Sequence, residues 1–207
     1  MPTKTKAKPR RKSAGRKPVA RRAPSKTRTA GRNSDLKQIV TMLEDDHSKV
    51  GKLFKRYDKM KDAEDTARFE LASQICAMLK VHVTIEEELF YPPAREVLVD
   101  EDDLIDEAEV EHMWAKQLIA DIEKMETGDP LYDAKVKVLG EYIHHHAGEE
   151  EDELFPKLKK DAEGQFDGVF AQMKEMRQTL EDDVAAGGKL KRETGLDASE
   201  RKPMELS

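Results

Sequence analysis

Two segments of the sequence repeat the same arrangement of side chains that can bind metal ions. HVTIEEELFYP, from His82, and HAGEEEDELFP, from His146, each place a Glu-Glu pair four and five residues after the histidine. Side chains four residues apart share one face of a helix, so His82 can act together with Glu86, and His146 with Glu150. The histidines lie 64 residues apart in a chain that has six histidines in all.

Two further histidines repeat at nearly the same interval. Asp46-His47 and Glu111-His112 lie 65 residues apart, which indicates that a whole helical hairpin is duplicated. His47 and His112 are in line with apolar residues at helical spacing, so both are expected to face the interior. Each of four helices therefore directs one histidine inward.

Carboxylates in such an interior require compensation, because an unpaired buried carboxylate takes up a proton or draws in water. A bound cation removes this cost, and imidazole with carboxylate but without thiolate suits iron, manganese or zinc. Six protein ligands suit two ions held ~3.5–4 Å apart, with carboxylates between them. A core histidine or a solvated acidic face is the alternative at any single position. The repeated His82/Glu86 and His146/Glu150 pairs favour the metal site.

The elements that hold these residues are predicted to be helices, because apolar residues recur at helical spacing and no useful strand-like alternation occurs. The predicted helices cover about 34–57, 69–91, 102–122, 131–155 and 165–184. The expected fold class is all-α, an antiparallel up-and-down four-helix bundle with a fifth, C-terminal helix. Phe69 and Cys76 are expected to pack in its core, and Trp114 in the core or in a groove. Cys76, as the single cysteine, excludes an internal disulfide.

The first 33 residues differ chemically from the rest of the chain. They contain 13 of the 37 Lys and Arg residues and no Asp or Glu, which leaves 24 basic against 43 acidic residues in 34–207. We predict a disordered basic tail over 1–33, a bundle domain over 34–185 and a flexible tail over 186–207. Residues 4–32 could bind nucleic acid non-specifically through its phosphates, or bind the acidic body of the same chain.

Other features bear on location. The acid-free start also fits a mitochondrial transit peptide, but its prolines and its lack of Leu and Phe argue against one. No apolar window is long enough to span a membrane. We expect a cytoplasmic protein, associated with the nucleoid or the nucleus if the tail binds nucleic acid, and the sequence does not predict its oligomeric state.

The combined motif resembles the hemerythrin-like, or HHE cation-binding, domain family. A histidine on the first helix, HxxxEE on the second, a histidine on the third and HxxxEE with LFP on the fourth carry the resemblance over about 34–160, or to about 185 with the fifth helix. It implies a non-haem centre of two iron ions, bridged by carboxylates and by oxo or hydroxo. Glu86 and one of Glu150 or Glu151 would bridge the irons. The implied terminal ligands are His47, His82, His112 and His146. Ferritin-like bundles use Glu-x-x-His, the reverse order, and are rejected on that ground.

One position departs from the oxygen-carrying members of the family, which place a second histidine four residues after the third-helix histidine. Here that residue is Lys116, which cannot bind a metal ion when protonated. One iron would then have an extra solvent position or use Glu109. The neighbours that point away from the metal face are assigned to supporting, surface or solvent roles: His144, His145, Glu87, Glu88 and Glu149.

The resemblance implies a module that binds or senses O₂, a related small oxidant such as peroxide or NO, or iron itself. The lost histidine argues against reversible oxygen carriage. One alternative is a nucleic-acid-associated protein whose basic tail acts while the bundle is a metal-stabilised scaffold. Another is a di-iron enzyme that consumes peroxide. The absence of a Gly-rich phosphate loop and of a nucleophile elbow favours a binding module over an enzyme.

Overall fold

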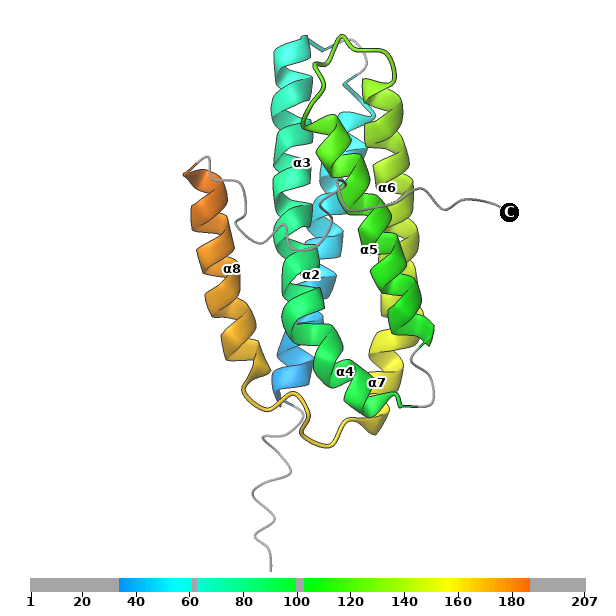
Figure 1. The fold of residues 1–207 in the computed structure, drawn as a ribbon, viewed down its shortest axis with the longest axis vertical. Helices are drawn as coiled ribbons and strands as arrows, with labels where there is room; N and C mark the ends of the chain where they lie inside the picture. Colours follow the sequence, from blue (N-terminus) through cyan, green and yellow to red (C-terminus); the bar gives the residue numbers. More distant parts are fainter. Residues whose placement is uncertain (1–33, 61–62, 100–102, 187–207) are drawn as a thin grey trace, which may run out of the picture.

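The described part of the chain, in this computed structural model, consists of helices joined by turns and loops (Figure 1). It comprises residues 34–60, 63–99 and 103–186, and no strand occurs in these ranges, which confirms the all-α fold class. The predicted basic tail lies outside the described residues, as do residues 187–207 of the predicted C-terminal tail. None of the described helices is long and apolar enough to cross a membrane.

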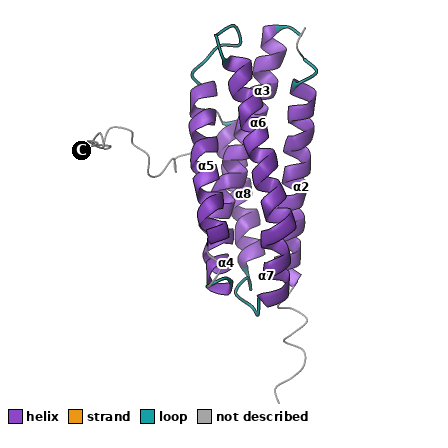
Figure 2. Ribbon diagram, turned by 90° about the vertical axis from the view of Figure 1, so that its right-hand side faces the viewer, coloured by secondary structure: helices purple, strands orange, loops and turns teal. Residues whose placement is uncertain are grey.

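Four helical rods run side by side along the long axis of the molecule, and a fifth helix lies against them (Figures 1 and 2). The first rod is α2 (Ser34–Tyr57), and the third is α5 (Asp103–Ile122). The second is α3 (Asp65–Ile85) with η2 (Glu86–Phe90) and α4 (Tyr91–Val97), and the fourth is α6 (Tyr132–Glu149) with η3 (Glu150–Leu154) and α7 (Phe155–Asp161). The fifth helix is α8 (Val169–Ala185).

The second and fourth rods both contain a π-helical turn, and it lies where the sequence carries Glu-Glu. In each rod the turn is followed by a short helix with proline in its first turn, Pro92 in α4 and Pro156 in α7. We expected these rods to end at the prolines, and that prediction is wrong. Proline is tolerated in the first turn of a helix, because the N–H it lacks has no obligatory partner there.

The fifth helix packs along the side of the bundle, against α2, α3 and η2. Met173 and Leu180 of α8 are buried, whereas each long rod of the bundle buries several side chains. Further apolar side chains of the helix pack partly buried against the same cluster: Val169, Phe170, Met176 and Val184. The helix is therefore held to the bundle along one apolar side.

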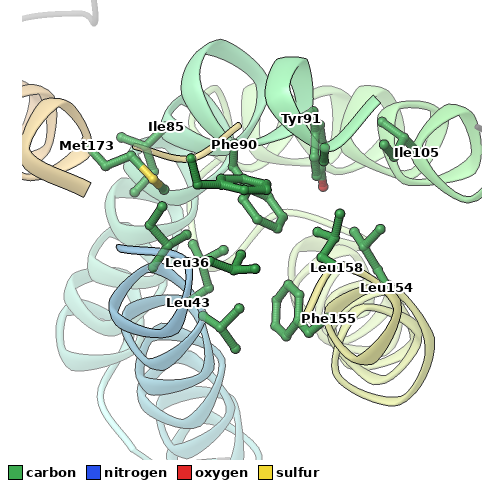
Figure 3. Close-up of a cluster of buried hydrophobic side chains, with 14 of the residues drawn as sticks. Leu36, Leu43, Ile85, Phe90, Tyr91, Ile105, Leu154, Phe155, Leu158 and Met173 are labelled. Carbon is green, nitrogen blue, oxygen red and sulfur yellow. The ribbon is translucent and has the colours of Figure 1, made fainter. Parts of the chain in front are cut away.

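The apolar core forms two clusters, one toward each end of the bundle. The cluster at the α4 and α7 end is rich in aromatic rings. Phe90, Tyr91 and Phe155 are labelled in Figure 3, and Phe166 belongs to the same cluster. The ring centroid of Phe90 lies 5.7–5.8 Å from those of the other three. Along the first, third and fourth rods, the buried polar residues fall between the residues of the two clusters, and on the second rod His82 and Glu86 lie at the near edge of the aromatic cluster, beside Val81 and Ile85. The fold thus places a polar layer between two apolar ones.

Truncation of Phe90 tests the aromatic cluster. Because Phe90 is 0% exposed, Phe90→Ala leaves a cavity and should lower the free energy of unfolding of the metal-free protein by about 3–5 kcal/mol. Chemical denaturation followed by circular dichroism measures the change. Phe69→Ala is the matched control, since Phe69 is 44% exposed and its truncation should cost far less. Equal losses in the two variants would contradict this core.

Candidate metal centre

Six of the predicted site residues converge in the polar layer of the bundle. All six side chains are buried, and each of the four rods contributes at least one. They are His47 of α2, His82 of α3, Glu86 of η2, His112 of α5, His146 of α6 and Glu150 of η3.

The donor atoms of these residues form two groups that share one carboxylate. His47, His82 and Glu86 make one group, and Glu86, His112 and His146 the other, with the donors of each group within 4.8 Å of one another. Glu86 Oε2 lies 3.1 Å from His82 Nε2 and 3.5 Å from His112 Nε2. Glu86 is therefore placed between the two histidine pairs.

Glu150 occupies the complementary position on the opposite rod. Its Oε2 lies 3.4 Å from His47 Nε2 and 3.8 Å from His146 Nε2, so it also reaches one histidine of each pair. Its Oε1 accepts a hydrogen bond from the hydroxyl of Tyr91, at 3.0 Å. Burial alone would raise the pKa of Glu150, but the imidazoles of His146 and His47 outweigh it and lower the pKa to about 2.

All four imidazoles direct Nε2 toward the interior, in two close pairs. His47 Nε2 and His82 Nε2 lie 3.2 Å apart, and His112 Nε2 and His146 Nε2 lie 3.0 Å apart. Burial, and then the neighbouring His146, lowers the pKa of His112 well below its ordinary value. Burial also lowers the pKa of His82. Both rings are thus favoured in the neutral form, which is the form that binds metal ions.

The outer nitrogen of each imidazole faces a carboxylate. His47 Nδ1 lies 2.9 Å from Glu151, His82 Nδ1 3.6 Å from Asp46, His112 Nδ1 3.2 Å from Glu87, and His146 Nδ1 2.9 Å from Glu111. The arrangement follows the duplication in the sequence. The acid before each of the first- and third-rod histidines, Asp46 or Glu111, faces the HxxxEE histidine of its own hairpin. The second glutamate of each HxxxEE segment faces the histidine of the other hairpin.

This donor set fits a pair of cations. A neutral imidazole whose Nδ1–H donates a hydrogen bond to a carboxylate presents a lone pair at Nε2, so His112 and His146 turn two lone pairs toward each other at 3.0 Å. Both carboxylate oxygens of Glu86 and Oε2 of Glu150 are buried without a hydrogen-bond partner among the described residues. Burial, and then the nearby charge of Glu150, raises the pKa of Glu86 well above its ordinary value. Cations would remove the repulsion at both kinds of donor.

Two residues predicted as alternative ligands lie outside this layer. Glu151 is 42% exposed and contacts the outer nitrogen of His47, whereas Glu150 points inward. Glu109 is exposed and lies 3.0 Å from Arg95 in an ion pair, away from the six donors. Lys116, at the position of the lost histidine, donates to Glu87 at 2.6 Å.

Glu87 and Tyr91 have contacts that sequence reasoning missed. We assigned Glu87 to solvent, but it is half-buried and links His112 to Lys116. Tyr91 is buried, and its hydroxyl lies 3.4 Å from His112 Nε2 as well as near Glu150. The equivalent residue of the second repeat is Phe155, whose ring stacks at 6.3 Å on that of His47. Only the alignment of the two repeats, Tyr against Phe, could have singled out Tyr91.

Two of the residues that we assigned away from the metal face lie close together on the surface. His145 is largely exposed, and its Nε2 lies 3.1 Å from Glu149 and 3.7 Å from Glu111. Burial, and then the opposing effects of His145 and the acidic neighbours, leaves the pKa of Glu149 raised. Exposed acidic groups with a histidine are common without an ion, so we assign no separate metal site to this group. Its role is to surround Glu111, which contacts His146.

Comparison with known proteins points to one family. The model of the hemerythrin HHE cation binding domain matches residues 38–158. The crystal structure of a hemerythrin HHE cation binding domain-containing protein from Mycobacterium kansasii is similar, with a TM-score of 0.56 and 20% identity, covering 71% of this chain and 91% of that chain. That likeness concerns the fold. No curated protein matches the chain.

Replacement of Glu86 tests whether the buried carboxylates destabilise the metal-free protein. Glu86→Gln keeps the shape and removes the charge, so it should raise the free energy of unfolding without metal by on the order of 1 kcal/mol. Denaturation in the presence of a chelator measures the change. Glu96→Gln, on the exposed face of α4, is the control and should have no effect. A marked loss of stability in Glu86→Gln would show that Glu86 is satisfied without a cation.

Proposed function

The chain belongs to the hemerythrin HHE cation-binding family, and on that premise we propose that it is a non-haem di-iron protein that binds or senses O₂, a related small oxidant, or iron. One observation carries the proposal. Two groups of nitrogen and oxygen donors share Glu86 in a buried layer to which all four rods contribute.

The donor positions suggest how two ions would be held. His47 and His82 would bind one ion and His112 and His146 the other, with Glu86 between them. Glu150 reaches a histidine on each side and would be the second shared ligand. Iron would supply a reversible change of oxidation state and coordination positions beyond those filled by the protein.

The surrounding residues would hold the ligands in place and keep water out. A carboxylate at Nδ1 fixes the ring orientation of a histidine ligand and raises its basicity. The two apolar clusters lie on both sides of the polar layer, and Phe155 stacks on His47. A site closed in this way limits the loss of a reactive bound species to water.

The number of protein donor groups would leave room for a small ligand on each ion. Two histidines and two shared carboxylates offer each ion four donor groups, and iron with imidazole and carboxylate ligands commonly takes up to six. Lys116 leaves the count unchanged, because it pairs with Glu87 and does not reach the six donors. Tyr91, whose hydroxyl lies near both Glu150 and His112, is the buried side-chain hydroxyl placed to donate to a ligand bound there.

The other two hypotheses stay predictions. Binding of nucleic acid depends on the basic residues 4–32, which lie outside the described residues, and sustained turnover of peroxide depends on chemistry that the donor set permits but does not single out. Neither gains a specific observation from the bundle, so the binding or sensing module is the function that we propose.

Metal analysis tests the centre. After anaerobic loading with Fe²⁺ and desalting, the protein should hold close to two iron ions per chain, and at a free concentration 100-fold above Kd the ions should stabilise it by about 2.7 kcal/mol per site. The double variant His82→Ala/His146→Ala should lose both the iron and the stabilisation. His144→Ala is the matched control, because His144 is exposed beside His146 on the same helix. Unchanged iron content in the double variant would refute the centre.

Optical spectroscopy tests the response to oxidants. Exposure of the Fe²⁺-loaded protein to O₂ or peroxide should produce strong near-ultraviolet bands of a ferric pair, and Glu150→Gln should weaken them because it removes one shared carboxylate. Anaerobic spectra before and after each addition measure the change. A spectrum that stays the same, with two irons still bound, would rule out the oxidant and leave iron binding itself as the function.

A further inference from the structure

The four carboxylates that face the outer nitrogens of the histidines are supported unequally. Glu87 pairs with Lys116, and Glu111 lies near the exposed His145. Asp46 differs from both, because it is 2% exposed and both its oxygens accept hydrogen bonds from the guanidinium of Arg177. Arg177 belongs to α8, a helix outside the duplicated hairpins.

His82, which lies next to this ion pair, also differs from the other three histidines in the contacts of its outer nitrogen. His82 Nδ1 lies 3.6 Å from Asp46 Oδ2, too far for a hydrogen bond, and is without a hydrogen-bond partner among the described residues. The outer nitrogens of the other three imidazoles each lie within 3.2 Å of a carboxylate. Asp46 is thus held by the guanidinium at a position that just misses His82.

The contact between Arg177 and Asp46 is an ion pair that joins α8 to α2, beside the apolar residues that pack α8 on the bundle. Both residues line a groove of about 650 Å³ between α8 and α2. Asp46 is therefore shared between the fifth helix and a candidate metal ligand, with no other residue between them.

We propose that Arg177 is a positioning residue that sets the orientation of His82 through Asp46, so that docking of α8 and metal binding on the His47/His82 side are coupled. The inference rests on the proposed di-metal centre. With Arg177 in place, the carboxylate of Asp46 is held close to His82 Nδ1, and a small shift of it completes the hydrogen bond when Nε2 binds an ion. Without Arg177, Asp46 keeps only the longer contact with Lys49 Nζ, at 3.7 Å, and its carboxylate is no longer held beside His82.

Coupling of this kind is reciprocal. Loss of an outer partner typically lowers the metal affinity of a histidine site 10–100-fold. If undocking of α8 weakens binding of one ion by about tenfold, binding of that ion must suppress undocking of α8 by the same factor. Metal occupancy would then be reported on the surface of the molecule by α8.

A titration of the full chain with Co²⁺ against a competing chelator tests the proposal. Arg177→Met should lower the affinity for one of the two ions about tenfold. The affinity for the other ion should stay near that of the unchanged protein. Lys174→Met, an exposed cation one turn away on α8, is the control and should bind both ions normally. Arg177→Lys keeps the charge without the two-pronged contact and should also weaken that ion, which keeps the test open if Arg177→Met does not fold.

Two further measurements separate positioning from general destabilisation. Asp46→Asn should lower the affinity for the same ion about tenfold. The double variant Asp46→Asn/Arg177→Met should lower it no further, because the two residues act in series. In the unchanged protein, Co²⁺ should slow amide hydrogen exchange in α8 about tenfold, and in Arg177→Met it should not.

The measured affinities distinguish failure of the coupling between α8 and His82 from failure of the di-metal centre. Normal affinity for both ions in the Arg177 variants, or a roughly hundredfold loss in the double variant, would overturn the inference while the di-metal centre stands. Failure of the unchanged protein to bind Co²⁺ or Fe²⁺ would instead refute the proposed function on which the inference rests.

Discussion

The structure depends on a polar layer that is unfavourable without a counter-charge. Glu86 and Glu150 are buried among four imidazoles, between two apolar clusters whose only hydrogen bond to either carboxylate, among the described residues, is the one from the hydroxyl of Tyr91 to Glu150. A proton on Glu86 relieves part of the repulsion, as its raised pKa indicates, but it leaves paired Nε2 lone pairs facing each other. Two cations would satisfy both kinds of donor together. The bundle is thus built so that its least stable layer is the one that a metal centre would stabilise most.

Duplication explains how the layer is held. Each hairpin supplies two histidines and one inward glutamate, and each also supplies the carboxylates that orient histidines of its own and of the other hairpin. The π-helical turns fall at the same place in both copies, at Glu86–Phe90 and at Glu150–Leu154. A π turn adds a residue to the helical path and so changes the direction of the side chains around it, which is why such turns are frequent at functional sites. At this turn the side chain of the first glutamate, Glu86 or Glu150, is buried in the polar layer, whereas that of the second, Glu87 or Glu151, is more exposed.

The bundle and the convergence of six donors could be predicted from the sequence, because helical spacing fixes which side chains share a face. Contacts between rods could not. Helical periodicity placed Phe69 in the core and Trp114 in the core or a groove, yet they are 44% and 51% exposed, since a periodic pattern does not show how wide the buried stripe is. Glu109 pairs with Arg95 on the surface and Glu87 turns toward His112, because both positions depend on which rod is adjacent.

The fifth helix breaks the symmetry of the duplicated bundle, because it contacts a residue that supports the site on one hairpin only. No counterpart of α8 covers the α5/α6 hairpin among the described residues, and there the acid before His112, Glu111, lies beside the exposed His145. On the other hairpin, Asp46 is enclosed and held by Arg177. Two halves with equivalent donors therefore have different surroundings. Since the affinity of an ion depends on what orients its ligands, the two positions should differ in affinity.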